Sequence, residues 1–145
     1  MEHLLAVWLY LQTHVLSVVL ALVASYVIGF TWHGPLFGKL WMKLNGMTPP
    51  KKGEMKFSMM LPGLAANFVL VVVQSAVLGR TFQIVNLPSA TDALVVATIL
   101  WLAFTALTIA NSYAWMGKTF KHICLDAAHY LVSIWAIAAI LYATL

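Results

Sequence analysis

The sequence predicts an all-α integral membrane protein, a four-helix bundle with a short amphipathic interfacial helix after the first span. Hydrophobic residues make up 63% of the chain and charged residues 8%, and the mean hydropathy is +0.92. Soluble domains are about one quarter charged. Four stretches, 3–38, 57–79, 93–117 and 127–145, carry no acidic or basic residue. Since crossing the hydrocarbon core takes about 20 apolar residues, these stretches predict four spans in a single membrane domain, 1–145.

The first span is expected over about residues 5–32. Ala21, Ser25 and Gly29 recur at every fourth position, and such a seam of small residues lets another helix approach closely. The apolar stretch is too long for the apolar region of a cleavable signal peptide, and no basic segment precedes it. We therefore expect it to be retained as a span.

The chain is predicted to turn at Gly34 and Pro35 into an interfacial helix over about residues 35–45. Proline suits the first turn of a helix, where its missing N–H costs nothing. An apolar stripe follows, with Lys39 and Lys43 beside it. We expect Trp41 to face lipid at headgroup depth and both lysines to reach lipid phosphates, with Gly46 ending the helix. The alternative is that this helix serves as a gate or a docking element.

The remaining spans are expected over about residues 59–79, 90–116 and 120–144. Gly79 and Arg80 are expected to close the second span, with residues 81–88 as a short external loop. Ser89 and Asp92 have the spacing of a capping box, which predicts a helix start near Ala90. Gly117 is expected to end the third span, and Thr119 is expected to cap the fourth.

The basic residues predict the orientation of the chain. The connection after the first span and the connection before the fourth lie on one side, and together they carry seven lysines: Lys39, Lys43, Lys51, Lys52, Lys56, Lys118 and Lys121. The opposite side carries only Arg80. The positive-inside rule then places the lysines in the cytoplasm and both termini outside. This basic rim facing anionic lipid accounts for the positive net charge, so no nucleic-acid partner is expected.

Polar residues inside the spans are the candidate functional residues, because each is costly there and tends to face the protein interior. In the fourth span His122, Asp126, His129 and Ser133 fall within an arc of about 60°. Asp126 and His129 should lie about 8 and 12 Å inward from the interface. We expect a polar pocket near the cytoplasmic leaflet, with Asp126 as its one carboxylate and with these further members: Tyr26, His33, Asn67, Asn111, His122 and His129.

Two kinds of role remain open for Asp126 and His129. A carboxylate and an imidazole at i and i+3 can pair, which favours their charged forms, whereas burial favours the neutral forms. The pair can be a proton relay or half of a metal site, or it can be a structural clamp to Asn111 or to a backbone carbonyl. Soft ligands on the cytoplasmic side, including Cys124, would suit Cu(I), yet the sequence has no CxxC, repeated Met motif or HExxH. No metal or other cofactor is therefore expected.

Two motifs resemble those of a known family. Residues 32–41, Trp-His-Gly-Pro-Leu-Phe-Gly-Lys-Leu-Trp, are followed by Gly117-Lys118 and then by Asp126 with the aromatic pair His129-Tyr130. These resemble family seventeen-sixty-one of the domains of unknown function, small four-span bacterial membrane proteins. The resemblance covers nearly the whole chain and implies a bacterial inner-membrane location but no activity. His33 stands where the family usually has Tyr, and the aromatic order near Asp126 is exchanged, so the resemblance assigns no role to His33 or His129.

Three classes of function follow from these observations. The first is a small transporter or channel-like protein with an inward-facing pocket around Asp126, working as a homo-oligomer because four short helices enclose little volume. The second is an accessory or assembly subunit whose small-residue seam docks on a larger membrane complex. The third is a membrane-embedded enzyme or a metal-handling protein, although no motif predicts catalytic residues. Membrane lipids are expected partners in every case.

Overall fold

A computed structural model describes residues 2–48 and 57–144, and these are helices joined by short turns, without strands. Lys51, Lys52 and Lys56, which contribute to the expected basic rim, lie outside the described residues. Two of the helical segments, η1 and η2, are π-helical turns with i→i+5 hydrogen bonding. The elements in chain order are α1 (Glu2–Thr13), α2 (Val15–Thr31), η1 (Trp32–Leu36), α3 (Gly38–Leu44), α4 (Phe57–Val85), α5 (Ala90–Leu100), η2 (Trp101–Ala106), α6 (Leu107–Trp115) and α7 (Phe120–Thr144).

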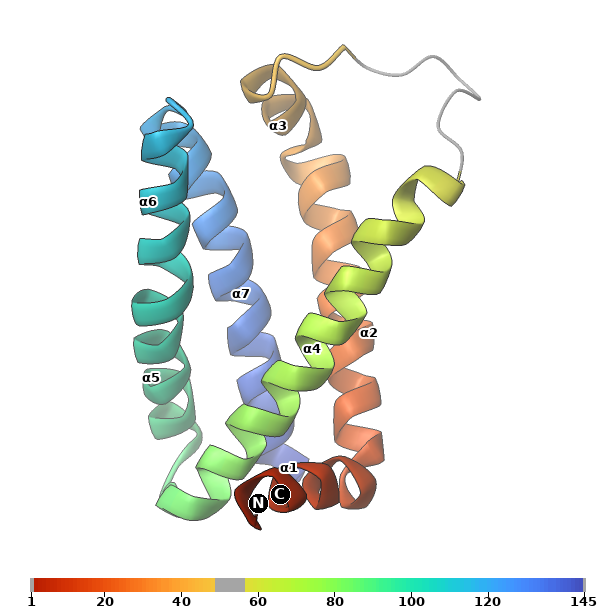
Figure 1. Ribbon diagram of the computed structural model, residues 1–145, viewed down its shortest axis with the longest axis vertical. Coiled ribbons are helices and arrows are strands. Elements are labelled where there is room, and N and C mark those ends of the chain that lie inside the picture. The colour runs from red at the N-terminus through yellow and green to blue at the C-terminus, as the bar shows by residue number, and fades with distance from the viewer. Residues whose placement is uncertain (1, 49–56, 145) are drawn as a thin grey trace.

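The predicted all-α architecture is confirmed, because four helical stretches are long and apolar enough to cross a membrane. They cover Val15–Leu36, Phe57–Val85, Ala90–Trp115 and Phe120–Thr144. α7 packs on α2, α4 and α5, whereas α4 crosses the other long helices obliquely (Figure 1). α1 lies across one end of the bundle, where both termini also lie (Figure 1). We call this the closed end, and we call the opposite end, with Lys39, Lys43, Lys118 and Lys121, the lysine end.

The first span is shorter than the expected 5–32, because the chain bends at His14 between α1 and α2. The polar side chains at the bend bind carbonyl groups at the end of α1. The Thr13 hydroxyl donates to the carbonyls of Leu9 and Tyr10, at 2.9 and 3.2 Å, and His14 Nδ1 lies 3.1 Å from the Tyr10 carbonyl. The His14 ring also stacks on the Tyr10 ring, with centroids 4.2 Å apart. Local side-chain bonds of this kind compete with a continuing helix.

The second span was expected to close at Gly79 and Arg80, but α4 continues to Val85, so most of the expected loop 81–88 is helical. The extra turns stay helical because they are packed. Phe82 is only 2% exposed, and the Tyr10 ring lies directly against the backbone of Gly79, where any Cβ would collide with it. α4 ends before Asn86, whose φ of 52° is the left-handed conformation that asparagine tolerates.

The boundaries of the third and fourth spans agree with the sequence signals. Ser89 caps α5 by accepting a hydrogen bond from the Asp92 amide at 3.2 Å. Gly117 follows the end of α6 with a φ of 65°, a conformation that suits glycine at a helix C-terminus. At the start of α7, the Thr119 amide donates to Nδ1 of His122 at 3.2 Å, which satisfies a free amide at the helix N-terminus.

The turn after the first span differs from the expected helix over about 35–45. Pro35 lies inside η1, which continues α2, and the next helix, α3, begins only at Gly38. η1 and α3 meet so closely that a Cβ on Gly38 would lie 2.6 Å from the His33 carbonyl oxygen. Gly46 follows the end of α3 with a φ of 64°, as its predicted terminating role requires. The chain therefore changes direction at Phe37 and Gly38 rather than at Gly34 and Pro35.

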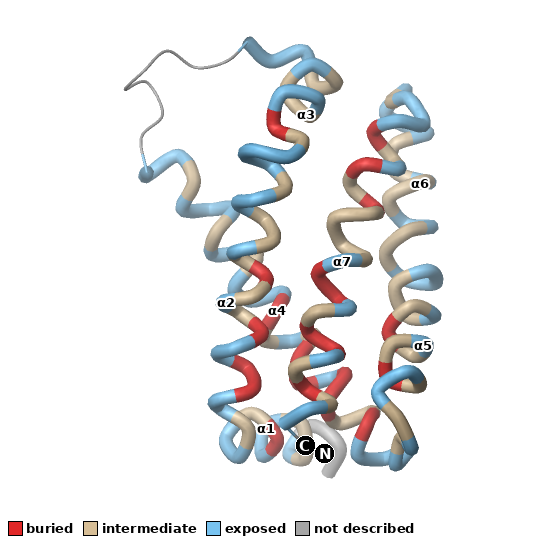
Figure 2. The backbone as a smooth tube through the Cα atoms, turned by 180° about the vertical axis from the view of Figure 1, so that it is seen from behind, coloured by how far each residue is buried: buried red, intermediate tan, exposed pale blue. Residues whose placement is uncertain are grey.

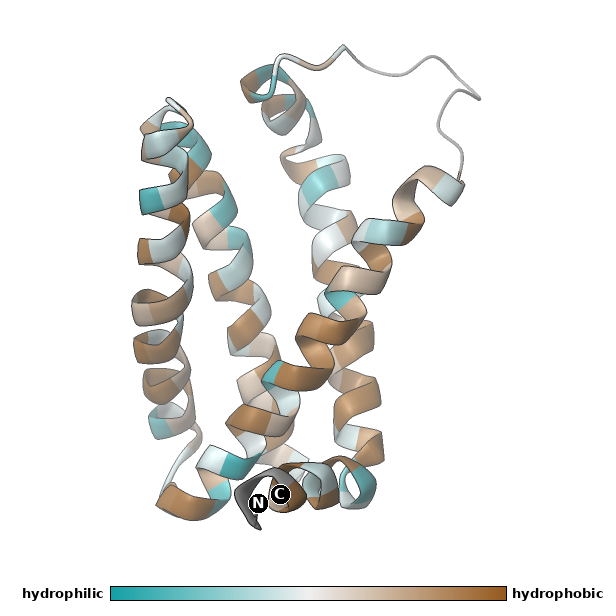
Figure 3. Ribbon diagram, viewed as in Figure 1, coloured by the Kyte–Doolittle hydropathy of each residue, from teal (hydrophilic) through white to brown (hydrophobic). Residues whose placement is uncertain are grey.

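The apolar core lies in the half of the bundle nearest the closed end. Most buried positions are there (Figure 2), while the long helices become paler and more hydrophilic toward the lysine end (Figure 3). η1 and α6, both at the lysine end, contain no buried residue. The core cluster comprises Tyr10, Ala21, Val71, Ala76, Leu78, Phe82, Ala93, Ala97, Ile134, Ile137, Ala138 and Leu141.

Candidate functional site

A cleft of about 300 Å³, lined by aromatic rings and by a few polar groups, lies in the lysine half of the bundle. Its lining comes from α6 and α7 on one side and from η1 and α3 on the other. The side chains that line it are His33 from η1, Trp41 from α3, Ile109 and Tyr113 from α6, and Asp126, His129 and Tyr130 from α7. We call this the Asp126 cleft.

Asp126 is the one carboxylate among the residues lining the cleft. The Tyr113 hydroxyl donates a hydrogen bond to Asp126 Oδ2 at 2.5 Å, and this bond joins α6 to α7. The side chain is only partly buried. A carboxylate has about four acceptor positions, so one phenol leaves Asp126 with most of its capacity available to a ligand or to water.

The two imidazoles of the cleft lie against each other and against aromatic rings. The His33 and His129 ring centroids are 4.8 Å apart, and the His33 ring meets the Trp41 ring edge-on at 5.6 Å. His129 also contacts Trp32 and Tyr130, with centroids 5.8 and 5.2 Å away. Within the described part of the chain, His129 Nε2 is buried and has no hydrogen-bond partner. Buried polar atoms are normally satisfied, so this nitrogen has unused bonding capacity beside the carboxylate.

The local sequence explains why these side chains converge. Asp126, His129 and Tyr130 stand at i, i+3 and i+4 on α7, and Ile109 and Tyr113 stand at i and i+4 on α6, so each set shares one helix face. Gly29 on α2 faces His129 and has no side chain, which leaves room for the imidazole. A Cβ at this position would lie 3.8 Å from His129 Nε2, at ordinary contact distance.

The small-residue seam predicted on the first span faces the other helices of the bundle, with Ala21 and Ser25 buried and Gly29 partly buried. Ala21 is 0% exposed and Ser25 is 5% exposed, and Gly29 faces His129 on α7. The Asn67 amide of α4 donates to the Ser25 hydroxyl at 3.4 Å. The seam therefore serves packing within this chain.

Several predicted pocket residues lie elsewhere. The Tyr26 hydroxyl donates to the Leu64 carbonyl at 2.8 Å, so Tyr26 and Asn67 both hold α2 against α4, away from the cleft. Asn111 is exposed and does not line the cleft. Asp126 is bound by Tyr113, whereas the expected clamp partners were His129 and Asn111.

His122 also lies outside the cleft, and it ties α3 to α7. Its Nε2 lies 2.6 Å from the Leu44 carbonyl and therefore donates to it, while Nδ1 accepts from Thr119. Beside it, Lys118 Nζ donates to Asn45 Oδ1 at 2.6 Å. α3 is thus held by two hydrogen bonds to the segment that begins α7.

Trp41 was expected to face lipid at headgroup depth, whereas in the structure its half-buried ring lines the Asp126 cleft. The helix turns it inward because α3 is tied to the protein at Leu44 and Asn45. Lys39 and Lys43 are exposed, and their contact with lipid stays a prediction.

Sequence reasoning missed Tyr113, Ile109 and the cleft position of Tyr130. Tyr113 stands about one helical turn before the helix end at Gly117. That spacing would have placed Tyr113 level with the start of α7.

The acidic, histidine and cysteine side chains are not gathered for metal binding in the described ranges. Within residues 2–48 and 57–144, no group of three or more of these side chains is positioned to hold a metal ion. His33, Asp126 and His129 share the cleft without forming such a group.

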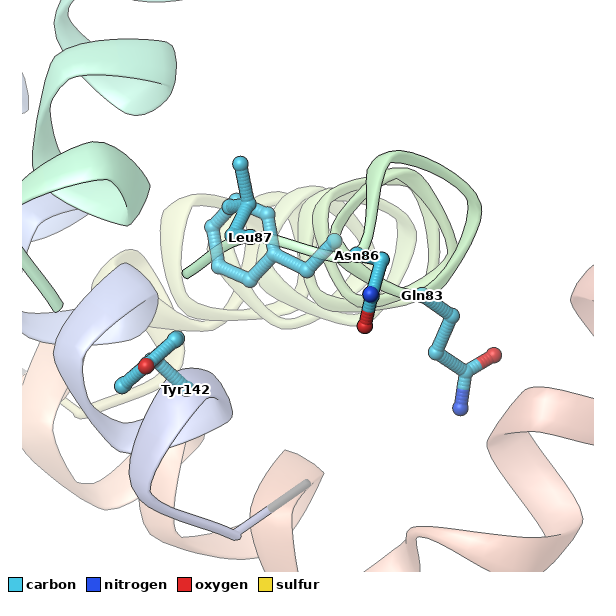
Figure 4. Close-up of a pocket in the computed structure, with 5 residues that line it drawn as sticks. Gln83, Asn86, Leu87 and Tyr142 are labelled. Atoms are coloured by element: carbon cyan, nitrogen blue, oxygen red, sulfur yellow. The ribbon is translucent and has the colours of Figure 1, made fainter. Parts of the chain in front are cut away.

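A second pocket, of about 500 Å³, lies at the closed end. Tyr142 on α7 faces the end of α4, from which Gln83 and Asn86 project, and Phe82 and Leu87 complete the lining (Figure 4). Gln83 and Asn86 are exposed, and no side-chain carboxylate or imidazole of the described residues lines this pocket. The Asp126 cleft is the smaller of the two, but it contains the carboxylate and both imidazoles and is the candidate site.

A family model described as "Protein of unknown function (DUF1761)" matches residues 16–142. The chain belongs to this family. The match begins at the start of α2 and ends near the end of α7, so it includes every residue that lines the Asp126 cleft. The resemblance inferred from residues 32–41 is thereby confirmed. No curated protein and no solved structure matches the chain.

Proposed function

We propose that this protein is a small transporter of the bacterial inner membrane whose substrate site is the Asp126 cleft. The observation that carries the proposal is a carboxylate with one phenol partner in a cleft of about 300 Å³, within helices long and apolar enough to span a membrane. An ionisable group inside a span is costly and is usually kept for function. A charge-handling role fits Asp126 better than a clamp to His129 or Asn111, because neither of these binds it.

The positive-inside rule supports a cytoplasmic location for the lysine end, so the cleft faces the cytoplasm and both termini lie outside. Cysteines at Asn86 and Thr144, both exposed at the closed end, should react with an impermeant thiol reagent in intact cells. A cysteine at the exposed Lys43 should react only after the cells are opened, with Cys124 replaced by Ser throughout. The opposite labelling pattern would reverse the orientation and the direction of the cleft.

We further propose that the protein works as a homo-oligomer, since one chain encloses only a small cleft. An accessory subunit docking through Ala21, Ser25 and Gly29 is less well supported, because that seam is occupied within the chain. Purification in mild detergent should give a homo-oligomer, whereas co-purification of a larger complex would favour the accessory role.

The transport proposal is tested with purified protein in liposomes, by recording charge movement after concentration jumps of protons, alkali cations and small amines. Asp126→Asn should remain folded and lose the signal, because the amide keeps the shape and removes the charge. Asp92→Asn is the matched control at the closed end, and it should retain the signal. A wild-type signal that Asp126→Asn leaves intact, or a deletion phenotype that this variant fully rescues, would overturn the proposal.

A further inference from the structure

We infer that the Asp126 cleft binds a small organic ammonium ion through its aromatic rings and its carboxylate. The inference rests on the proposed function, since it names the substrate class of the same site. The cleft is lined by one carboxylate, three aromatic rings from Trp41, Tyr113 and Tyr130, and the imidazoles of His33 and His129. A carboxylate beside several ring faces is the environment that recognises alkylated ammonium groups.

The three aromatic rings that line the cleft come from three different elements. Trp41 projects from α3, Tyr113 from α6 and Tyr130 from α7. Trp41 and Tyr130 are linked through the imidazoles, since His33 meets Trp41 at 5.6 Å and His129 at 4.8 Å, and His129 meets Tyr130 at 5.2 Å. The third ring, that of Tyr113, is joined to the carboxylate of Asp126 by a hydrogen bond.

The structure contains one ammonium group already placed on a ring of this set. Lys118 Nζ lies 5.3 Å from the centroid of the Tyr113 ring, within the distance at which a cation is attracted to a ring face. Lys118 is held there by Asn45 and does not line the cleft. The Tyr113 ring thus stands in a setting where an ammonium ion is accommodated.

Other ligand classes fit the lining less well. Alkaline-earth ions need about six or more oxygen ligands, whereas the side chains here supply one carboxylate and two phenols. An anion would meet Asp126, and among the described residues neither lysine nor arginine lines the cleft. At about 300 Å³ the cleft is at the lower end of the usual range for ligand pockets, roughly 300–1,000 Å³, which favours a small ligand.

The test measures binding of tetramethylammonium and choline to the purified protein in detergent by titration calorimetry. The neutral control ligand is 3,3-dimethylbutan-1-ol, in which carbon replaces the nitrogen of choline. Trp41→Leu should weaken binding of both cations about tenfold, because it removes a ring face while keeping apolar bulk. Asp126→Asn should weaken it at least as much. Trp115→Leu is the matched control, since Trp115 is 85% exposed and lies outside the cleft, and it should change affinity less than twofold.

The outcomes separate this inference from the transport proposal. Binding of both cations but not of the neutral alcohol, weakened by Trp41→Leu and unaffected by Trp115→Leu, supports the inference. Proton or alkali-ion movement that depends on Asp126, without binding of either organic cation, overturns the inference and leaves the transport proposal standing. Equal binding of choline and the alcohol also overturns it, because the site would then recognise shape and not charge. If Trp41→Leu does not fold, Trp41→Phe should weaken binding about threefold, since phenylalanine is a weaker cation–π partner.

Discussion

The two ends of the bundle differ in how closely their helices pack. At the closed end Val71, Phe82, Ile137 and Leu141 are at most 2% exposed, and α1 lies across the helices there. At the lysine end η1 and α6 bury no residue, and the Asp126 cleft is lined by α6 and α7 and by η1 and α3. The difference indicates that close apolar packing at one end holds the helices together, which leaves the other end free to keep an accessible cleft with polar groups.

A matched pair of isoleucine substitutions should show the largest contrast between the two ends. Ile137 is 0% exposed in the core, whereas Ile109 lines the Asp126 cleft. Ile137→Ala should lower the free energy of unfolding by about 1.5 to 3 kcal/mol, because it leaves a cavity in the core. Most of the loss comes from the cavity, since lipid is as apolar as the protein interior and transfer between them contributes little. Ile109→Ala should cost less than about 1 kcal/mol, because the cleft already lacks packing on one side. Reversible unfolding in mixed detergent micelles measures both, and equal losses would contradict the division between the ends.

Filling the contact between α1 and α4 should have the next largest effect. A Cβ at Gly79 would collide with the Tyr10 ring, so Gly79→Ala should cost about 1 to 3 kcal/mol by overpacking and should displace α1. Gly63→Ala is the control, because nothing lies near a Cβ at that position. Protease sensitivity near His14 reports whether α1 has moved, and an unchanged pattern would show that α1 does not depend on this contact.

Removing the hydrogen bond between α6 and α7 should have a moderate effect on stability. Tyr113→Phe keeps the ring and deletes the donor to Asp126, so the loss should be about 0.6 to 1.7 kcal/mol, the range for hydrogen bonds between membrane helices. The same unfolding assay measures it. Thr98 and Trp135 provide the comparison, since their bond of 2.8 Å joins α5 and α7 nearer the closed end, and Trp135→Phe should cost a similar amount.

The attachment of α3 should be the least costly to break. Lys118→Met removes the bond to Asn45 and should change the free energy of unfolding by less than about 1 kcal/mol, because the pair is near the surface. Spin labels on Lys43 and Lys121, both exposed, should nevertheless show a broader distance distribution between α3 and α7. An unchanged distribution would mean that His122 alone holds α3 through the Leu44 carbonyl.

The sequence predicts the spans well because hydrophobicity along a helix is a local property. Ser89, Gly46 and Gly117 also mark helix ends correctly, since caps and left-handed glycines act within a few residues. The bend at His14 and the continuation of α4 past Gly79 were missed, because each depends on contacts of Tyr10 with the bend or with α4.

The candidate site could be predicted only in part. The shared helix face of Asp126 and His129 follows from spacing alone, and the structure places His33 beside them in the cleft. Asn111, Asn67 and Tyr26 were included because they lie at a similar depth, but depth does not define which way a helix faces. Trp41 and Tyr113 enter the cleft through the placement of α3 and α6, which depends on tertiary packing.

The π-helical turn η2 has a consequence for the length of the third span. Ala93 and Ala97 of α5 are buried in the core, and Tyr113 of α6 binds Asp126 on α7, so both halves of this span use the side toward α7. An unbroken α-helix turns about 100° per residue, so positions 93 and 113 would point roughly 200° apart. The wider turn at Trp101–Ala106 takes up part of that difference. A one-residue deletion within η2 would leave a regular helix with a net rotation of about 100° between the two positions, so Tyr113 should stay near the side that faces Asp126. The π-helical turn therefore accommodates one residue of extra length in this span, whereas a deletion in α5 or α6 would turn Tyr113 away from Asp126.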